Sequence, residues 1–154
     1  MVILGIDPGT QRMGYGLVRK EGQSVVYVDG GIVEVKTKDP SQALLELKNG
    51  IDVLIKKYKP SALAVEKLFF MKNQKTAMSV AEARGVVLFA AAEAGIQVQE
   101  YAPNEVKSSI TGHGMADKEA VSKMVRLILK EPDLALIDDA MDALALAIIG
   151  AWNI

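Results

Sequence analysis

The chain opens with Val2-Ile3-Leu4-Gly5-Ile6-Asp7-Pro8-Gly9-Thr10, an apolar run that stops abruptly. The β-branched residues of this run predict a short buried strand over residues 2–6. Pro8 cannot donate a ladder hydrogen bond and Gly9 permits a sharp turn, so the strand is expected to end at Asp7. A carboxylate is therefore expected at the carboxyl end of a buried strand, where open α/β sheets gather functional residues.

Two further strands are expected to follow the first and to complete a meander. Residues 14–18 and 25–35 have strand composition, with a turn at residues 21–23 between them. Beyond them the pattern predicts helices over 41–58, 76–94, 104–110, 118–129 and 138–152, and strands over 62–65 and 96–101. Three meandering strands followed by β/α alternation predict an α/β fold, with a five-stranded mixed sheet flanked by helices on both faces.

The composition indicates one domain that needs no disulfide cross-link to fold. The chain has 154 residues, no cysteine and a formal net charge of −1. We therefore expect a single domain over residues 1–154, without a disulfide, a thiolate zinc site or a cysteine nucleophile. No apolar run reaches the ~18 residues of a membrane span, and the first residues lack the pattern of a secretory signal. These features favour a cytoplasmic protein with no membrane contact.

Four carboxylates are candidates for one metal site. Asp7 and Glu66 end two short apolar strands, so they lie side by side if these strands are parallel neighbours. Asp139 and Asp142 are spaced i, i+3 and share one face of the final helix. That helix is apolar beyond them, so Asp142 is expected to face a polar cleft or a cation. Such a cluster suits Mg²⁺ or Mn²⁺, and two ions would activate a water and stabilise the leaving oxygen of a phosphodiester.

The aspartates also have ordinary structural interpretations. Asp7 could serve as a turn residue, Asp138 as a helix N-cap and Asp139 as a partner of the helix dipole. Glu66 has no capping role at a strand end flanked by apolar residues. His113 is the only histidine of the chain and lies in a glycine-flanked turn, which favours a structural role over a catalytic one.

A basic segment with aromatic residues directly follows Glu66. Residues 67–75 contain three lysines, Lys72 and Lys75 among them, no acidic residue and two of the three phenylalanines of the chain. Phosphate-binding lysines interleaved with aromatics suit a surface on which DNA strands separate and bases stack. Of the neighbours Phe69 and Phe70, one is expected in the core and the other exposed, because adjacent side chains rarely face the same way.

Taken together, the motifs resemble those of the RuvC family. Each motif alone is weakly specific, whereas the ordered set spans almost the whole chain and is highly specific. The motifs are Gly5-Ile6-Asp7-Pro8-Gly9-Thr10, Gly14-Tyr15-Gly16, Val65-Glu66, Ala83-Arg84-Gly85, Glu100-Tyr101-Ala102-Pro103, Thr111-Gly112-His113-Gly114 with Lys118, and Asp139-Ala140-Met141-Asp142-Ala143-Leu144-Ala145-Leu146-Ala147.

The resemblance implies an RNase H-like fold and a homodimeric endonuclease that cuts four-way (Holliday) DNA junctions in homologous recombination and DNA repair. It implies a Mg²⁺-dependent reaction with catalytic and metal-binding roles for Asp7, Glu66, Asp139 and Asp142. Asp138 with Asp142 would also share a helix face, at i, i+4, but the family pattern favours Asp139.

The same resemblance assigns DNA contacts. Phe69 would be the exposed wedge of the basic segment. Lys107 and Lys118 would lie near the scissile phosphate and stabilise charge in the transition state. A RuvA–RuvB branch-migration complex is implied as a partner of the enzyme.

The helix predicted over residues 76–94 supports the homodimer. Its apolar residues surround much of its circumference, and one sheet face cannot cover all of them. A four-way junction offers two symmetric scissile strands, which a two-fold dimer matches. The alternative is a helix buried between the sheet and other helices of one chain.

Three other functions stay open on the residues alone. The loop at residues 5–10 also resembles the first phosphate loop of actin-like ATPases and sugar kinases, although those proteins pair two domains around a nucleotide. A junction binder without activity, or a protein-interaction module, would not need all four carboxylates. A nuclease for RNA–DNA hybrids would share the catalytic edge and differ in the segment after Glu66 and in the dimer.

Overall fold

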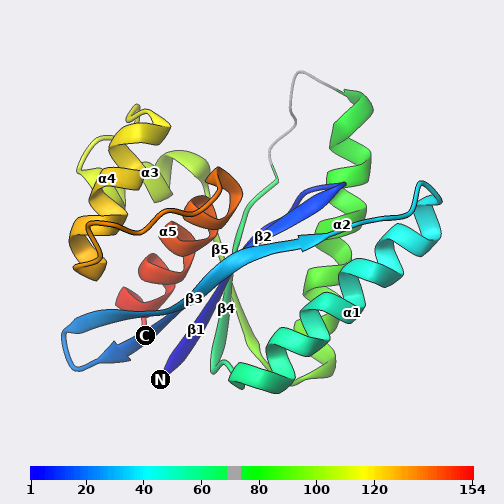
Figure 1. Cartoon of the computed structure of the whole chain (residues 1–154), viewed down its shortest axis with the longest axis horizontal. Helices are drawn as coiled ribbons and strands as arrows, with labels where there is room; N and C mark the ends of the chain where they lie inside the picture. The colour runs from blue at the N-terminus through cyan, green and yellow to red at the C-terminus, as the bar shows by residue number, and fades with distance from the viewer. Residues whose placement is uncertain (69–73) are drawn as a thin grey trace.

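One mixed sheet forms the centre of the molecule, and the computed structural model describes residues 1–68 and 74–154 (Figure 1). The described residues form five strands in the order β3-β2-β1-β4-β5. The strands are β1 (Val2–Asp7), β2 (Arg12–Glu21), β3 (Ser24–Glu34), β4 (Ala62–Glu66) and β5 (Gln97–Tyr101). β1 pairs antiparallel with β2 and parallel with β4. β2 in turn pairs antiparallel with β3, and β4 pairs parallel with β5. The predicted mixed sheet is confirmed.

β2 is longer than the sequence pattern predicts. It extends from Arg12 to Glu21 rather than over residues 14–18, and it pairs with β3 along its whole length. Its end residues are polar, so the apolar pattern stops before the ladder does. The backbone hydrogen bonds to β3, rather than side-chain burial, therefore set its ends.

Helices cover both faces of the sheet, as predicted. In Figure 1, one face carries α1 (Pro40–Tyr58) and α2 (Gln74–Glu93), and the other carries α3, α4 and α5. These last helices span Pro103–Thr111, Lys118–Leu129 and Asp138–Trp152. Each face has its own apolar core, one built on Leu4 and Ile6 and the other on Ile3 and Ala64. No helix in the described part of the chain combines the length and apolar character that a bilayer crossing requires.

Helix α5 lies unusually close to the sheet because the strands beneath it carry glycine. A Cβ on Gly5 would collide with the carbonyl oxygen of Ala143, and a Cβ on Gly14 would collide with that of Asp139. A Cβ on Gly16 would meet the backbone of Leu144. The absence of these three side chains lets the helix backbone rest on β1 and β2, and it fixes where the first turn of α5 lies.

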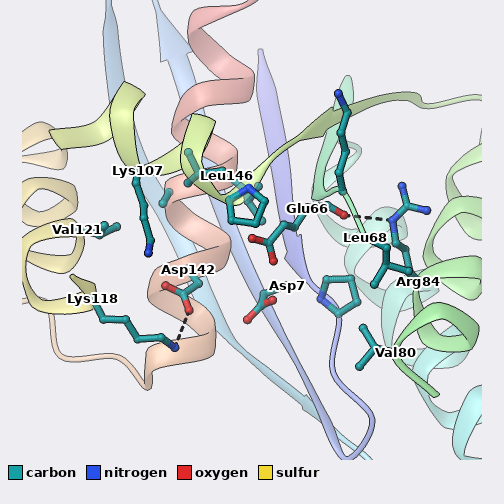
Figure 2. A pocket seen from close by; sticks show the side chains of 15 residues that line it. Asp7, Glu66, Leu68, Val80, Arg84, Lys107, Lys118, Val121, Asp142 and Leu146 are labelled. Carbon is teal, nitrogen blue, oxygen red and sulfur yellow. Dashed lines mark hydrogen bonds and ion pairs between the residues drawn. The ribbon is translucent and has the colours of Figure 1, made fainter. Parts of the chain in front are cut away.

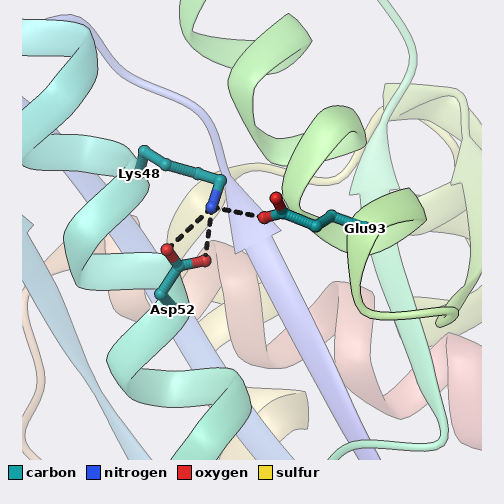
Figure 3. A network of polar contacts seen from close by, with 3 residues as sticks. All are labelled: Lys48, Asp52 and Glu93. Carbon is teal, nitrogen blue, oxygen red and sulfur yellow. Dashed lines mark hydrogen bonds and ion pairs between the residues drawn. The ribbon is translucent and has the colours of Figure 1, made fainter.

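A charged cluster joins α1 to α2 on the opposite face. The Lys48 ammonium lies 2.7 Å from Asp52 and 2.8 Å from Glu93, and 5.7 Å from the centre of the Phe89 ring (Figure 3). Asp52 is on the same helix as Lys48, whereas Glu93 and Phe89 belong to α2. The cluster therefore ties the two helices to each other where α2 ends.

Helix α2 buries one face and exposes another that is also apolar. Its inner face packs into the core through Ala83, Val87, Ala90 and Ala91. The side chains of Met78 and Phe89 are 71% and 61% exposed. They share the outer face with the exposed small residues Ala81, Gly85 and Ala92. The expectation that one sheet face cannot cover this helix is therefore confirmed.

The glycine contacts make a stability prediction. Gly5→Ala should lower the free energy of unfolding by about 1–3 kcal/mol or more, because the new Cβ meets helix backbone that cannot rotate away. Chemical denaturation measures the change. Gly114→Ala is the matched control, because a Cβ there meets no atom closer than 3.5 Å. Equal stability of Gly5→Ala and the wild type would show that α5 is not held at this distance.

Candidate active site

Asp7 and Glu66 lie side by side at one edge of the sheet. β1 and β4 are parallel, and Ile6 pairs with Val65, so the next residue of each strand stands at the same carboxyl end. Both strands are buried up to that point and both carboxylates are partly exposed. The predicted juxtaposition of the two strand ends is confirmed.

The first turns of α5 bring two more carboxylates to the same edge. Gly14 pairs with Asp7 across β1 and β2, and the backbone of Asp139 lies directly against Gly14. In Figure 2 Asp142 lies in the same cleft as Asp7 and Glu66, and its carboxylate points toward Lys118. The close seat of α5 on the glycines is thus what places Asp139 and Asp142 beside the strand ends.

Burial, and after it the crowding of these carboxylates, raises two of their pKa values. Burial, followed by repulsion from Asp142, Glu66 and Asp139, raises the pKa of Asp7 from 3.8 to about 7. Burial and repulsion from Asp142 also raise the pKa of Glu66, although Lys107 and Lys118 oppose that change. The site therefore holds more negative charge than its surroundings compensate.

Two of the carboxylates are paired with cationic side chains. The Lys118 ammonium lies 3.2 Å from Asp142, which raises the pKa of that lysine. Arg12 pairs with Asp139 through its Nε atom. Within residues 1–68 and 74–154, no three acidic or imidazole groups already stand close enough together to hold one metal ion. In both ion pairs the carboxylate faces a cationic side chain.

A cleft of about 520 Å³ opens over Asp7, Glu66 and Asp142. Lys107 of α3 and Lys118 of α4 stand on one side of it in Figure 2, and Val80 and Arg84 of α2 stand on the other. The two lysines singled out from the sequence thus line the same cleft as the carboxylates. A smaller hollow on the other side of Asp7 is lined by residues 7–12 and Asp139.

Arg84 joins α2 to the end of β4. Its Nε donates a hydrogen bond to the backbone oxygen of Glu66 at 3.1 Å, and its Nη2 pairs with Glu100 of β5. Arg84 and Arg12 were not assigned a role from the sequence. Arg84 does leave a signal, because it is a lone basic residue in an apolar stretch of helix. Arg12 leaves none.

The other predicted residues have different outcomes. Phe69 and Lys72 lie outside the described residues, as does the side chain of Lys75 at the start of α2. The Nδ1 atom of His113 accepts a hydrogen bond from the Met115 backbone at 3.2 Å, which agrees with a structural role in the turn. The N-cap prediction for Asp138 is wrong: the cap is Ile137, with no side-chain cap, and Asp138 is already the first residue of α5.

The donor set fits a hard divalent cation. Asp7, Glu66, Asp139 and Asp142 offer only carboxylate oxygens, the ligands that Mg²⁺ and Mn²⁺ prefer. Burial, together with repulsion from the neighbouring carboxylates, raises the pKa of Asp7, so a negative charge is disfavoured there in the absence of a cation. A small cation bound there would supply the compensating positive charge.

Comparison with known proteins identifies the family. Residues 3–150 match the family described as crossover junction endodeoxyribonuclease RuvC. The chain belongs to the RuvC family. A RuvC protein of Desulfitobacterium hafniense is 46% identical over 155 residues, covering 100% of this chain and 94% of the relative. One from Rubrobacter xylanophilus is 48% identical over 153 residues, covering 99% and 86%.

Solved RuvC structures share the fold. Thermus thermophilus RuvC superposes with a TM-score of 0.90 at 35% identity, covering 99% of this chain and 94% of that one. The same protein in complex with a Holliday junction substrate gives a TM-score of 0.91 at 35% identity, with the same coverage. The RNase H-like fold expected from the RuvC motifs is therefore confirmed.

The raised pKa of Asp7 predicts a pH-dependent stability. An acid with a raised folded-state pKa loses stability as the pH rises from its unfolded pKa of 3.8 to about 7, and the full penalty remains above that pH. Without divalent cations, Asp7→Asn should therefore melt above wild type at pH 8, by on the order of 2 kcal/mol or ~4–8 °C. Near pH 4 the difference should vanish, as thermal unfolding in EDTA would reveal.

The control is Asp138→Asn, which removes an exposed carboxylate on the same helix turn as Asp139. It should not raise the melting temperature at either pH. Equal melting temperatures of Asp7→Asn and the wild type at pH 8 would mean that burial and carboxylate repulsion do not destabilise the charged form of Asp7.

Proposed function

We propose that the chain resolves four-way DNA junctions by metal-dependent hydrolysis of two symmetric strands, in homologous recombination and DNA repair. As a RuvC-family protein it is an endodeoxyribonuclease. The observation that carries the proposal is the juxtaposition, in one cleft, of Asp7, Glu66 and Asp142 with Lys107 and Lys118. Acidic groups suit cation binding and the lysines suit a phosphodiester, so the cleft combines both requirements of the reaction.

The proposed roles follow from position. We assign Asp7, Glu66, Asp139 and Asp142 as the ligands of two Mg²⁺ ions, which Mn²⁺ can replace. Bound divalent cations supply an activated water and stabilise charge on the leaving oxygen. Lys107 and Lys118 approach the carboxylates from α3 and α4, where their ammonium groups can hold the scissile phosphate and stabilise its developing negative charge.

The basic segment after Glu66 completes the proposed DNA surface. Lys67 and Leu68, the described residues directly after the β4 carboxylate, line the cleft. We assign Phe69 as a wedge at the junction and Lys72 and Lys75 as phosphate contacts. Base stacking on an aromatic and phosphate contact by lysine suit a branched DNA with unpaired bases.

We further propose that the protein is a homodimer built on the outer face of α2. Met78, Ala81, Gly85, Phe89 and Ala92 recur every three or four residues, so they form one apolar stripe along the helix. Small residues allow close approach, and two-fold symmetry would give one cleft to each of two strands. Cooperation with a RuvA–RuvB complex and a cytoplasmic location complete the proposal, since the relatives named above are bacterial enzymes of DNA processing.

The carboxylate assignment predicts the effect of single substitutions. Asp7→Asn, Glu66→Gln and Asp142→Asn should each abolish junction cleavage, because an amide is a poor ligand for a hard cation. Junction affinity should change little, since phosphate contacts come from lysines and not from the carboxylates. Cleavage of a synthetic four-way junction with and without Mg²⁺, beside a gel-shift measurement in EDTA, tests both statements.

Asp138→Asn is the matched control, because it lies on the same turn as Asp139 and outside the cleft lining. It should cut at nearly the wild-type rate. Wild-type cleavage by Asp142→Asn would exclude α5 from the site. Preferential cleavage of linear duplex or of an RNA–DNA hybrid by the unaltered protein would contradict junction specificity.

The dimer proposal predicts the effect of placing a charge in the apolar stripe of α2. Met78→Glu should shift the protein from a dimer toward the 16.6 kDa monomer in analytical ultracentrifugation at micromolar concentration, because a charge would be buried without a partner. Leu127→Glu is the control: Leu127 is 68% exposed on α4, away from the stripe. A wild-type protein that sediments only as a monomer would refute the interface.

A further inference from the structure

A second polar hollow adjoins the cleft on the other side of Asp7. It has a volume of about 380 Å³ and is lined by residues 7–12 and Asp139. Asp7 lines both hollows, so a DNA backbone that places one phosphate in the cleft brings a neighbouring phosphate within reach of the second. None of the DNA contacts assigned above lies there.

Arg12 is the one cationic side chain among the residues that line this second hollow. Its Nε atom pairs with the Asp139 carboxylate. The Arg12 side chain is 50% exposed and that of Asp139 is 23% exposed. The guanidinium therefore lies at an open rim, where an anion from solution can reach it while Asp139 stays in the wall.

This ion pair keeps Asp139 from acting as a cation ligand. A carboxylate oxygen that accepts from a guanidinium offers less of its charge to a metal ion, and its orientation is set by the arginine. A guanidinium also binds phosphate well, through parallel N–H donors. Asp139 and a DNA phosphate therefore compete for the Arg12 guanidinium. Arg12 and a divalent metal ion likewise compete for the Asp139 carboxylate.

We propose that Arg12 is a positioning residue that exchanges the Asp139 carboxylate for a phosphate of the DNA backbone in the second hollow. The exchange frees Asp139 to bind a divalent cation, so DNA and cation favour each other's binding at this point. Such coupling is reciprocal by thermodynamic linkage. The inference rests on the proposed function, because it takes junction DNA as the ligand and Asp139 as part of the metal site.

The test replaces Arg12 by glutamine and measures two affinities in the absence of cleavage. Without DNA, Mn²⁺ should bind Arg12→Gln about twofold to fivefold more tightly, because Asp139 is no longer paired. Electron paramagnetic resonance of Mn²⁺ measures this. In EDTA, a four-way junction should bind roughly threefold more weakly, and the salt dependence should fall by about one phosphate contact. A damaged fold would weaken both affinities rather than move them in opposite directions.

Two variants sharpen the result. Arg12→Lys keeps the charge, so its salt dependence should match the wild type. Arg19→Gln removes an exposed ion pair of the same kind, with Glu21 at 2.6 Å on the same strand, and should change neither affinity. An unchanged or weaker Mn²⁺ affinity of Arg12→Gln, or an unchanged salt dependence, overturns the inference. If the wild type binds neither ligand, the proposed function fails; if it binds both and Arg12→Gln matches it, only the exchange fails.

Discussion

The distance between α5 and the sheet is the constraint on which the rest of the structure depends. Gly5, Gly14 and Gly16 provide a bare strip of backbone on β1 and β2. The helix packs against this strip with small buried residues, among them Ala140, Ala143 and Ala147. Ordinary side chains at these positions would lift the helix and carry its acidic first turns away from Asp7. A packing requirement in the core is therefore also a requirement of the site.

Electrostatic compensation in the site is strongest at its rim and weakest at its centre. The side chains of Lys118 and Arg12, which pair with Asp142 and Asp139, are 68% and 50% exposed. Asp7 lies between these pairs, and its pKa is raised to about 7 by burial and by its acidic neighbours. The two lysines and Arg12 approach the carboxylates from the sides of the site, and neither ion pair involves Asp7. A compact divalent cation would fit there, as the proposed metal site requires.

The sequence predicted the frame of the site well, because that frame depends on local patterns. Short apolar strands ending in Asp7 and Glu66, and an apolar helix with acidic first turns, could be recognised from neighbouring residues alone. The ion pairs of Arg12 and Arg84 could not, because each depends on how two different elements pack against each other. The cap of α5 was misassigned for a related reason: helices usually begin after a polar cap, whereas Ile137 fills that place here.

Helix α2 carries two kinds of residue that alternate along one short stretch. Val80 and Arg84 line the cleft, while Ala81 and Gly85, each the very next residue, face outward. Successive residues of a helix are about 100° apart, so this arrangement depends on the exact number of residues in this part of the helix. A one-residue insertion or deletion between positions 80 and 85 would rotate one part of the helix against the other by about 100° and displace both faces. A change of length in the loops outside α2 would leave the rotation of the helix, and so both faces, unaffected.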